Sequence, residues 1–335
     1  MIRFVALALL SVALCGAQQL KILVAGQNPE TIADWQTASD KVKLVRVTSE
    51  TAMGEIADAD AYIGNISPEL VKAGKKLRWV QTLSAGVEQV LHKTGSDALA
   101  KSDIVLTNNQ IVQGPEIADH AMAMLLAHTR FLPTYMQRQA DENWQGRPYT
   151  LVELNGKNAL VIGMGGIGLQ IAIRAWAHGM NVVGVDPEDI AYLPYVDKIV
   201  KPDMLDSVIG DADVVFMAAP HTPASHKMIG SSQFDAMKQG AYFIAVSRGG
   251  TYDLSSLVKA LDSKKLAGAG VDVTDPEPLP KGHALWKMDN VIITPHIAGR
   301  SDMDRGRMLG IVKSNIKRFA EGQRLHNVVD KQKGY

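Results

Sequence analysis

The chain alternates, from residue 20 onward, between short runs of aliphatic and β-branched residues and longer stretches with helical spacing. In the first third of the chain the short runs occupy residues 20–25, 42–47, 61–64, 77–83 and 103–108. Alternation of this kind is typical of a parallel sheet covered by helices. The pattern therefore predicts an α/β fold.

A longer apolar stretch follows, and it predicts a helix from about Glu116 to Arg130. Pro115 suits the first turn of a helix, where its missing N–H costs nothing. The apolar positions of this stretch are almost continuous, which indicates a helix buried on most of its surface. We expect it to lie between two domains.

The next segment, residues 131–157, is polar and is interrupted by prolines. It either wraps around a neighbouring subunit or forms a plain surface loop, and we expect Trp144 within it to be a packing residue.

Residues 158–187 contain a strand, a glycine-rich turn, an amphipathic helix and a second strand. In a turn of this spacing the first glycine permits the tight bend, the second lets the backbone approach a pyrophosphate, and the third allows close helix packing. The helix N-terminus offers N–H groups and a positive dipole end to phosphates. The residues of the predicted dinucleotide site are Gly163, Gly165, Gly166, Ile167 and Gly168.

Asp186 ends the second strand, 23 residues after Gly163. A carboxylate at this place can accept hydrogen bonds from an adenosine ribose, and it would repel a ribose 2′-phosphate. The following Pro187, Glu188 and Asp189 provide no arginine to bind such a phosphate. We therefore expect NAD(H) rather than NADP(H).

Four further strands are expected within residues 213–220, 241–250, 268–273 and 290–296. In an open parallel sheet, ligands bind beyond the carboxyl ends of the strands. Arg248, Glu277 and His296 follow or end three of these strands, so they should converge on one nicotinamide ring. A guanidinium suits a substrate carboxylate, and a carboxylate beside an imidazole stabilises its protonated form. Together they suggest a proton donor and an anion-binding group.

Composition narrows the kind of partner. Basic and acidic residues balance at 35 each, and no basic block occurs, which argues against a nucleic-acid surface. Cys15 is the only cysteine, and the nine histidines show no metal-ligand spacing, so no metal site is predicted. A small-molecule ligand is expected.

Residues 1–17 have the layout of a secretory signal peptide: Arg3, an apolar run, and the small residues Cys15 and Ala17 before Gln18. The run is too short to span a bilayer. The pattern predicts an exported protein, periplasmic or secreted, with no membrane association after the leader is removed. The alternative is a buried N-terminal strand in a cytoplasmic protein.

The motifs GMGGIG with Asp186, SRGG with Arg248, GVDVTDPEPLP with Glu277, and TPHIAG with His296 occur in this order. With them, the chain from about residue 21 to 328 resembles the D-isomer-specific 2-hydroxyacid dehydrogenases. The resemblance implies a Rossmann-type nucleotide domain, residues 116–299, inserted into a flavodoxin-like substrate domain formed by residues 20–115 and 300–330. It also implies a homodimer and a returning C-terminal helix near residues 303–321.

The resemblance further implies roles. His296 would be the acid/base, Glu277 would hold it charged, and Arg248 would bind a 2-keto acid that NADH reduces to the D-2-hydroxy acid. The substrate carboxylate would meet backbone N–H groups of Ser84, Ala85, Gly86 and Val87. Further cofactor contacts would come from Pro220, Ser225, Val246 and Asp272.

One departure from the family pattern is Ala245, because many relatives have Asn three residues before the arginine. This position could loosen the support of Arg248. A protein of another class remains as the alternative: a non-catalytic, dinucleotide-sensing binding protein on the same fold.

Overall fold

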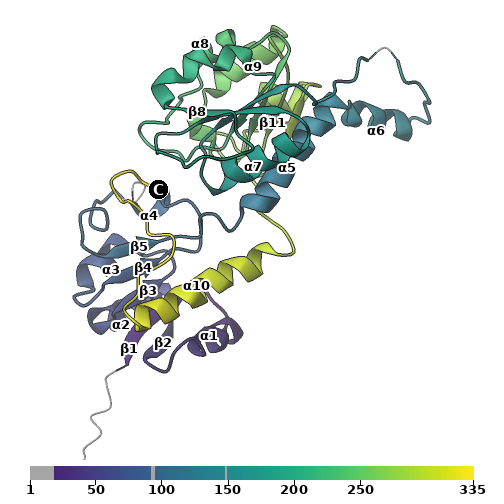
Figure 1. Ribbon diagram of the computed structural model, residues 1–335. Helices are drawn as coiled ribbons and strands as arrows, with labels where there is room; N and C mark the ends of the chain where they lie inside the picture. The colour runs from purple at the N-terminus through teal and green to yellow at the C-terminus, as the bar shows by residue number, and fades with distance from the viewer. Residues whose placement is uncertain (1–18, 92–94, 148) are drawn as a thin grey trace, which may run out of the picture.

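The computed structural model describes residues 19–91, 95–147 and 149–335. The predicted leader lies outside these residues. Within them the chain forms two parallel sheets, each flanked by helices, with a long helix running alongside the first sheet (Figure 1). No helix of the described residues is both long and apolar enough to cross a membrane.

The first sheet has five strands in the order β2-β1-β3-β4-β5. The chain moves from β1 to β2 on one side and then places β3, β4 and β5 on the other, so its direction reverses between β1 and β3. The strands are β1 (Leu20–Ala25), β2 (Val42–Val47), β3 (Ala61–Ile63), β4 (Trp79–Gln81) and β5 (Val105–Thr107). This strand order is flavodoxin-like.

Helices cover both faces of this sheet, and their starts follow local rules. Asn28 and Ser67 cap helices that open with a proline, because their side-chain oxygens accept from backbone N–H groups three residues on. The helices are α1 (Pro29–Gln36), α2 (Ser49–Glu55), α3 (Pro68–Ala73) and α4 (Glu88–Leu91). The C-terminal helix α10 (Asp304–Ala320) returns to this sheet, where Val312 and Ile316 are fully buried.

The second sheet has seven parallel strands in the order β12-β11-β10-β9-β6-β7-β8, and it reverses direction between β6 and β9. Its strands are β6 (Asn158–Ile162), β7 (Asn181–Val185), β8 (Lys198–Val200), β9 (Val214–Met217), β10 (Ala241–Ala245), β11 (Leu266–Val271) and β12 (Val291–Ile293). Its helices are α7 (Gly166–Ala177), α8 (Ser231–Ala236) and α9 (Leu254–Asp262). The strand order confirms the predicted Rossmann-type sheet.

Helix α5 (Gly114–Thr129) links the two sheets and begins where the proline predicts. Met122, Met124 and Leu125 are buried in the same apolar cluster as Val161 of β6 and Ile171 of α7. The helix therefore packs as part of the second sheet's core, on the face that α7 also covers.

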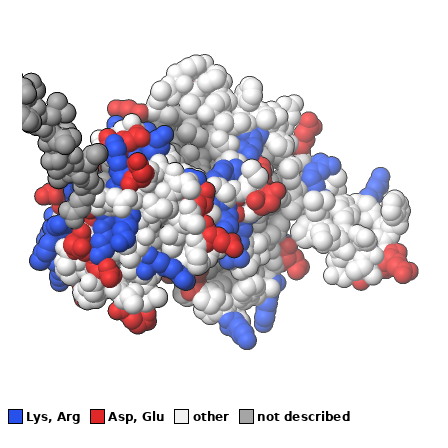
Figure 2. All heavy atoms as spheres, turned by 90° about the horizontal axis from the view of Figure 1, so that it is seen from below, with Lys and Arg blue, Asp and Glu red and all other residues white. Residues whose placement is uncertain are grey.

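Residues Leu132–Ala140 of the segment after α5 form the helix α6, which was not predicted. Figure 1 shows it projecting from the body of the molecule, and Figure 2 shows the same projection from below. Trp144 is fully exposed, so the expectation that it packs within its own chain is wrong for this structure. In Figure 2, positive and negative side chains are interspersed on the visible face.

Candidate active site

The glycine-rich turn between β6 and α7 leaves no room for side chains on its protein side. Gly163 has φ +89°, and a Cβ there would lie 2.6 Å from the Ala219 backbone. A Cβ on Gly168 would lie 1.8 Å from the Gly163 carbonyl oxygen. At Gly165 no atom lies within 4 Å of the place that a Cβ would occupy. The turn is therefore closed toward the protein and open at the glycine that should face a pyrophosphate.

Helix α7 begins at Gly166 and Ile167, and its N-cap residue Gly165 supplies no side-chain cap. The first N–H groups of this helix are available to an anion, and the helix dipole favours negative charge there. These observations fit a dinucleotide phosphate. The residues that would hold it are Gly165, Gly166 and Ile167.

Asp186 follows β7 and is buried beside this turn. Its carboxylate accepts from the backbone N–H of Met164 at 2.7 Å and from that of Glu188 at 2.8 Å. The side chain therefore fixes the glycine turn against the end of β7. Each carboxylate oxygen has a second lone pair, which leaves Asp186 able to accept a ribose hydroxyl as well.

The other predicted cofactor residues lie at the ends of β9 and β10. Ser225 donates to the Pro220 carbonyl at 2.5 Å, so it closes the turn between residues 220 and 225. Val246 is buried directly after β10. Ser247, which follows it, was not among the predicted residues, yet its hydroxyl is buried without a partner in the described chain. An orphaned polar atom here fits a polar group of a bound nicotinamide or substrate.

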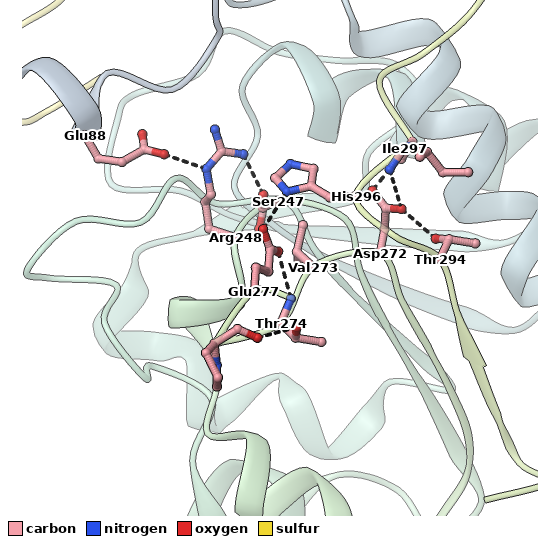
Figure 3. A network of polar contacts seen from close by, with 12 residues as sticks. Glu88, Ser247, Arg248, Asp272, Val273, Thr274, Glu277, Thr294, His296 and Ile297 are labelled. Atoms are coloured by element: carbon pink, nitrogen blue, oxygen red, sulfur yellow. Dashed lines mark hydrogen bonds and ion pairs between the residues drawn. The ribbon is translucent and has the colours of Figure 1, made fainter. Parts of the chain in front are cut away.

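His296 lies after β12 with φ +53°, a left-handed conformation that few non-glycine residues adopt. Its backbone N–H donates to the carbonyls of Asp272 and Thr294, at 2.9 and 3.0 Å. Its Nδ1 lies 2.9 Å from Oε2 of Glu277 (Figure 3). The predicted carboxylate–imidazole pair is therefore present, and Nε2 is the ring nitrogen left to face a ligand.

The Glu277 carboxylate is itself held, because Oε1 accepts from the Thr274 backbone N–H at 3.0 Å. The side chains of His296 and Glu277 are 45% and 39% exposed. This exposure shows that the pair opens onto a solvent-accessible space, as a group that exchanges protons with a substrate requires.

Asp272 holds in place the loop of residues 294–298 that contains His296, which we call the histidine loop. Its carboxylate accepts from the Thr294 hydroxyl and from the backbone N–H groups of Ile297 and Ala298, at 2.6 to 3.0 Å. His120 of α5 contacts Thr294 at 2.9 Å and extends this network. In this structure Asp272 therefore positions the loop, while its contact with a nicotinamide carboxamide stays a prediction.

Arg248 extends from the end of β10 toward Glu88 (Figure 3). Its Nε donates to Oε1 of Glu88 at 2.9 Å, and its Nη1 donates to the Ser247 carbonyl at 2.8 Å. Glu88 opens helix α4, so this ion pair joins the two halves of the molecule. Sequence reasoning did not select Glu88, since no motif marks it and its partner lies 160 positions away.

The predicted substrate loop, Ser84–Val87, is fixed through its carbonyl groups. The Asn108 side-chain amide donates to the Ala85 carbonyl at 2.6 Å, and the backbone N–H of Asn109 donates to the Ser84 carbonyl at 3.0 Å. A Cβ on Gly86 would lie 2.3 Å from Nη2 of Arg248. The loop and the guanidinium are therefore adjacent. Within the described chain no N–H of residues 84–87 has an acceptor.

The structure thus gathers the predicted substrate loop with Arg248, and His296 with Glu277, at the carboxyl ends of strands from both sheets. Among the described residues, no three His, Cys, Asp or Glu side chains are arranged to hold a metal ion. The two sheets and the glycine turn define a nicotinamide dinucleotide-binding α/β protein, with the Arg248–Glu88 ion pair between its halves.

Comparison with known proteins gives the family. Residues 122–298, more than half of the chain, match the model of the D-isomer specific 2-hydroxyacid dehydrogenase NAD binding domain. A solved D-isomer specific 2-hydroxyacid dehydrogenase family protein from Aeromonas salmonicida is 30% identical, with a TM-score of 0.77 over 94% of this chain and 99% of that one. The chain belongs to the D-isomer specific 2-hydroxyacid dehydrogenase family.

Curated relatives differ in name and length. A glyoxylate reductase of Korarchaeum cryptofilum is 30% identical over 83% of this chain and 84% of its own length. A D-3-phosphoglycerate dehydrogenase of Archaeoglobus fulgidus is 29% identical over 93% of this chain. The chain spans only 59% of that relative and 54% of a second phosphoglycerate dehydrogenase, from Methanocaldococcus jannaschii.

Proposed function

We propose that this protein is an NAD(H)-dependent oxidoreductase that interconverts a small 2-keto acid and its D-2-hydroxy acid. The observation that carries the proposal is the 2.9 Å contact between His296 Nδ1 and Glu277. The pair belongs to the same sheet as the dinucleotide turn and as Arg248. Membership of the family and a relative named glyoxylate reductase support the same reaction class.

Each side chain has a defined task in this reaction. The nicotinamide, when bound, supplies or accepts the hydride. His296 donates a proton from Nε2 to the keto oxygen during reduction and takes it back in the reverse direction. Glu277 accepts a hydrogen bond from Nδ1–H, which fixes the ring orientation and stabilises the imidazolium. Positioned acid/base groups of this kind contribute roughly 10² to 10⁴ in rate.

Arg248 and the loop of residues 84–87 hold the substrate. The guanidinium binds the substrate carboxylate and polarises the carbonyl, because its planar N–H groups match carboxylate geometry. The N–H groups of the loop have no acceptor within the described chain, so they offer further donors to the same carboxylate. These contacts orient the keto carbon toward the hydride.

The proposed cofactor is NAD(H) rather than NADP(H). The Asp186 carboxylate lies at the end of β7, where a ribose 2′-phosphate would be repelled, whereas the carboxylate of Glu188 is paired with Lys333 at 2.6 Å. The cofactor preference is measured by comparing the dissociation constants of NADH and NADPH by fluorescence titration. NADPH should bind more weakly.

An NADH-oxidation assay against a panel of 2-keto acids tests the function, using protein without residues 1–17. The variant His296→Asn should lose turnover and still bind NADH. His178→Asn is the matched control, because His178 is exposed and bonds only to its own helix. Full activity of His296→Asn would refute the assigned proton donor. Tight NADH binding without turnover of any keto acid by the wild type would instead favour a dinucleotide sensor.

Two further parts of the proposal concern the whole chain. Export from the cytoplasm follows from the predicted leader, and N-terminal sequencing of the protein recovered outside the cytoplasm would test it by finding Gln18 first. A homodimer follows from the family resemblance and from the exposed apolar side chains on the projecting segment around α6.

A further inference from the structure

The C-terminal segment, residues 326–335, is fastened to the first sheet. The backbone N–H of Val329 donates to the Leu106 carbonyl of β5 at 2.9 Å. The Lys331 ammonium donates to three backbone carbonyls of the stretch that leads into β5. These carbonyls belong to Leu99, Ser102 and Ile104. The segment therefore begins as part of the first half of the molecule.

The other end of the C-terminal segment contacts the second half. Lys333 Nζ lies 2.6 Å from Oε1 of Glu188, and the Tyr335 hydroxyl donates to the same oxygen at 2.9 Å. Glu188 lies in the turn after β7, two residues beyond Asp186. Figure 1 shows the end of the chain lying between the two halves. The segment thus reaches from β5 to the turn where the proposed function places the adenosine ribose.

An internal turn gives the C-terminal segment a defined shape. The Asp330 carboxylate accepts from the backbone N–H groups of Gln332 and Lys333, at 2.9 and 3.1 Å. The Asp330 N–H donates to the Tyr335 carbonyl at 2.9 Å, and the Asp330 carbonyl accepts from the Gly334 N–H at 2.8 Å. With its turn closed in this way, the segment presents Lys333 and Tyr335 to the second half together.

This contact flanks Asp186 without occupying it. The N–H groups that Asp186 accepts come from Met164 and Glu188 of its own half, whereas Lys333 and Tyr335 donate to Glu188. Burial and the carboxylates of Glu188 and Asp186 raise the pKa of the Tyr335 hydroxyl to about 12, so this hydroxyl is a donor at neutral pH. The remaining lone pairs of Asp186 stay open to ribose hydroxyls beside the segment.

The same contact changes the charge at this turn. Lys333 pairs with Glu188, and Lys201 pairs with the adjacent Asp189 at 2.6 Å. Asp186 instead accepts backbone N–H groups. The lysine of the C-terminal segment therefore screens a carboxylate that lies close to Asp186. Because a dinucleotide is itself an anion, this screening favours its binding.

We propose that Lys333 and Tyr335 form the outer wall of the adenosine-ribose site, so that the cofactor is held by residues of both halves. The proposal rests on the proposed function, because it assumes that Asp186 binds the ribose. A ligand that contacts both halves stabilises the arrangement in which they are joined. Cofactor binding thereby favours the arrangement that brings the proposed substrate loop close to the proposed acid/base pair.

Two fragments of the cofactor test this role. ADP-ribose keeps the adenosine half, and reduced nicotinamide mononucleotide keeps the reacting ring without the adenosine. In the double variant Lys333→Gln/Tyr335→Phe, calorimetric titration should find the dissociation constants of ADP-ribose and NADH raised by about fivefold or more. The dissociation constant of reduced nicotinamide mononucleotide should not change.

Gln332→Ala is the matched control, because it changes an exposed side chain of the same segment. It should bind all three ligands like the wild type. The side chains of Lys333 and Glu188 are 48% and 44% exposed, and an ion pair this exposed contributes little to folding stability. The double variant should therefore fold, and thermal unfolding checks this.

Unchanged affinity of the double variant for ADP-ribose overturns the proposal. Tighter binding of ADP-ribose would show that the C-terminal segment obstructs the ribose site, which overturns it as well. Equal weakening of both fragments would indicate a general loss of structure and would also contradict the assigned role. These titrations need no turnover. If no keto acid oxidises NADH, the proposed function fails, and the affinity for ADP-ribose still decides the role of Lys333 and Tyr335.

Discussion

His296 adopts a backbone conformation that a non-glycine residue normally avoids, and the structure shows what maintains it. Its N–H and the N–H groups of Ile297 and Ala298 all donate to Asp272, through its carbonyl or carboxylate oxygens. Strained residues persist where surrounding contacts over-determine them. The imidazole is therefore directed at Glu277 by the loop as well as by the ion pair.

Glu277→Gln tests the contribution of that ion pair. The amide cannot stabilise an imidazolium, so kcat/KM for keto acid reduction should fall by about 10²-fold, the lower end of what a positioned acid/base contributes. NADH affinity, followed by fluorescence, should not change. Asp275→Asn, an exposed neighbour, is the control. Retention of wild-type kcat/KM in Glu277→Gln would show that the carboxylate does not assist His296.

His128 leads to a prediction about pH and stability. Burial lowers the pKa of its imidazole, and its Nε2 lies 2.9 Å from the Ala269 carbonyl, so the neutral ring donates there. The unfolded chain binds a proton near the ordinary histidine pKa of about 6.5, while the folded chain does not. The free energy of unfolding should therefore fall as the pH drops from about 6.5 toward the lowered pKa of the folded state. Above about pH 6.5 the contribution of His128 to stability should be complete.

Chemical denaturation at several pH values measures this effect. His128→Gln should be less stable overall but should lose part of the pH dependence between about 6.5 and 5. The exposed His178→Gln should keep the wild-type slope. An unchanged slope in His128→Gln would assign the acid sensitivity to other groups.

At the scale of elements, the turn between β6 and α7 needs glycine for two different reasons: close backbone packing at Gly168, and open space for a ligand at Gly165. Gly168→Ala should cost about 1 to 3 kcal/mol of stability, because the added methyl collides with backbone that cannot move away. Gly165→Ala should fold with near wild-type stability, since the space there is open toward the ligand. Thermal unfolding and NADH titration separate the two: both variants should bind NADH weakly, and only Gly168→Ala should be destabilised.

Several elements were predictable from local pattern. β1 and β2 have the predicted bounds because a run of alternating or continuous apolar residues is long enough to identify a strand. β4 and the unpredicted β8 have only three residues each, and pairing with a neighbouring strand decides their extent. Helix α6 was missed because its residues are polar and Pro133 reads as an interruption, although a proline fits a first helical turn.

At the scale of the whole molecule, three ion pairs and a returning helix join the halves. Glu88 pairs with Arg248, Glu116 of α5 pairs with Arg307 of α10 at 2.6 Å, and Glu188 after β7 pairs with Lys333 of the C-terminal segment at 2.6 Å. The proposed substrate loop belongs to the first sheet, while the proposed acid/base pair, His296 and Glu277, belongs to the second. The site is complete only when both halves are folded and in contact.

The projecting segment predicts assembly. Leu132, Met136 and Trp144 are 47%, 69% and 103% exposed, which is unusual for large apolar side chains on a monomer. Light scattering after size exclusion should find a dimer, and Met136→Glu should shift it toward monomer. Met204→Glu, which changes a methionine that is 51% exposed and follows β8, should remain dimeric. A monomeric wild type would contradict the prediction.

The sequence by itself determined most of the strands and helices, the glycine turn with Asp186, and the choice of Arg248, Glu277 and His296 as candidates, because each depends on short-range periodicity or on a contiguous motif. Only the tertiary structure decided which distant groups meet. Glu88 pairs with Arg248, Asn108 and Asn109 hold the substrate loop, and Asp272 fixes the histidine loop. These contacts depend on how two sheets face each other, and no local pattern of side chains encodes that arrangement.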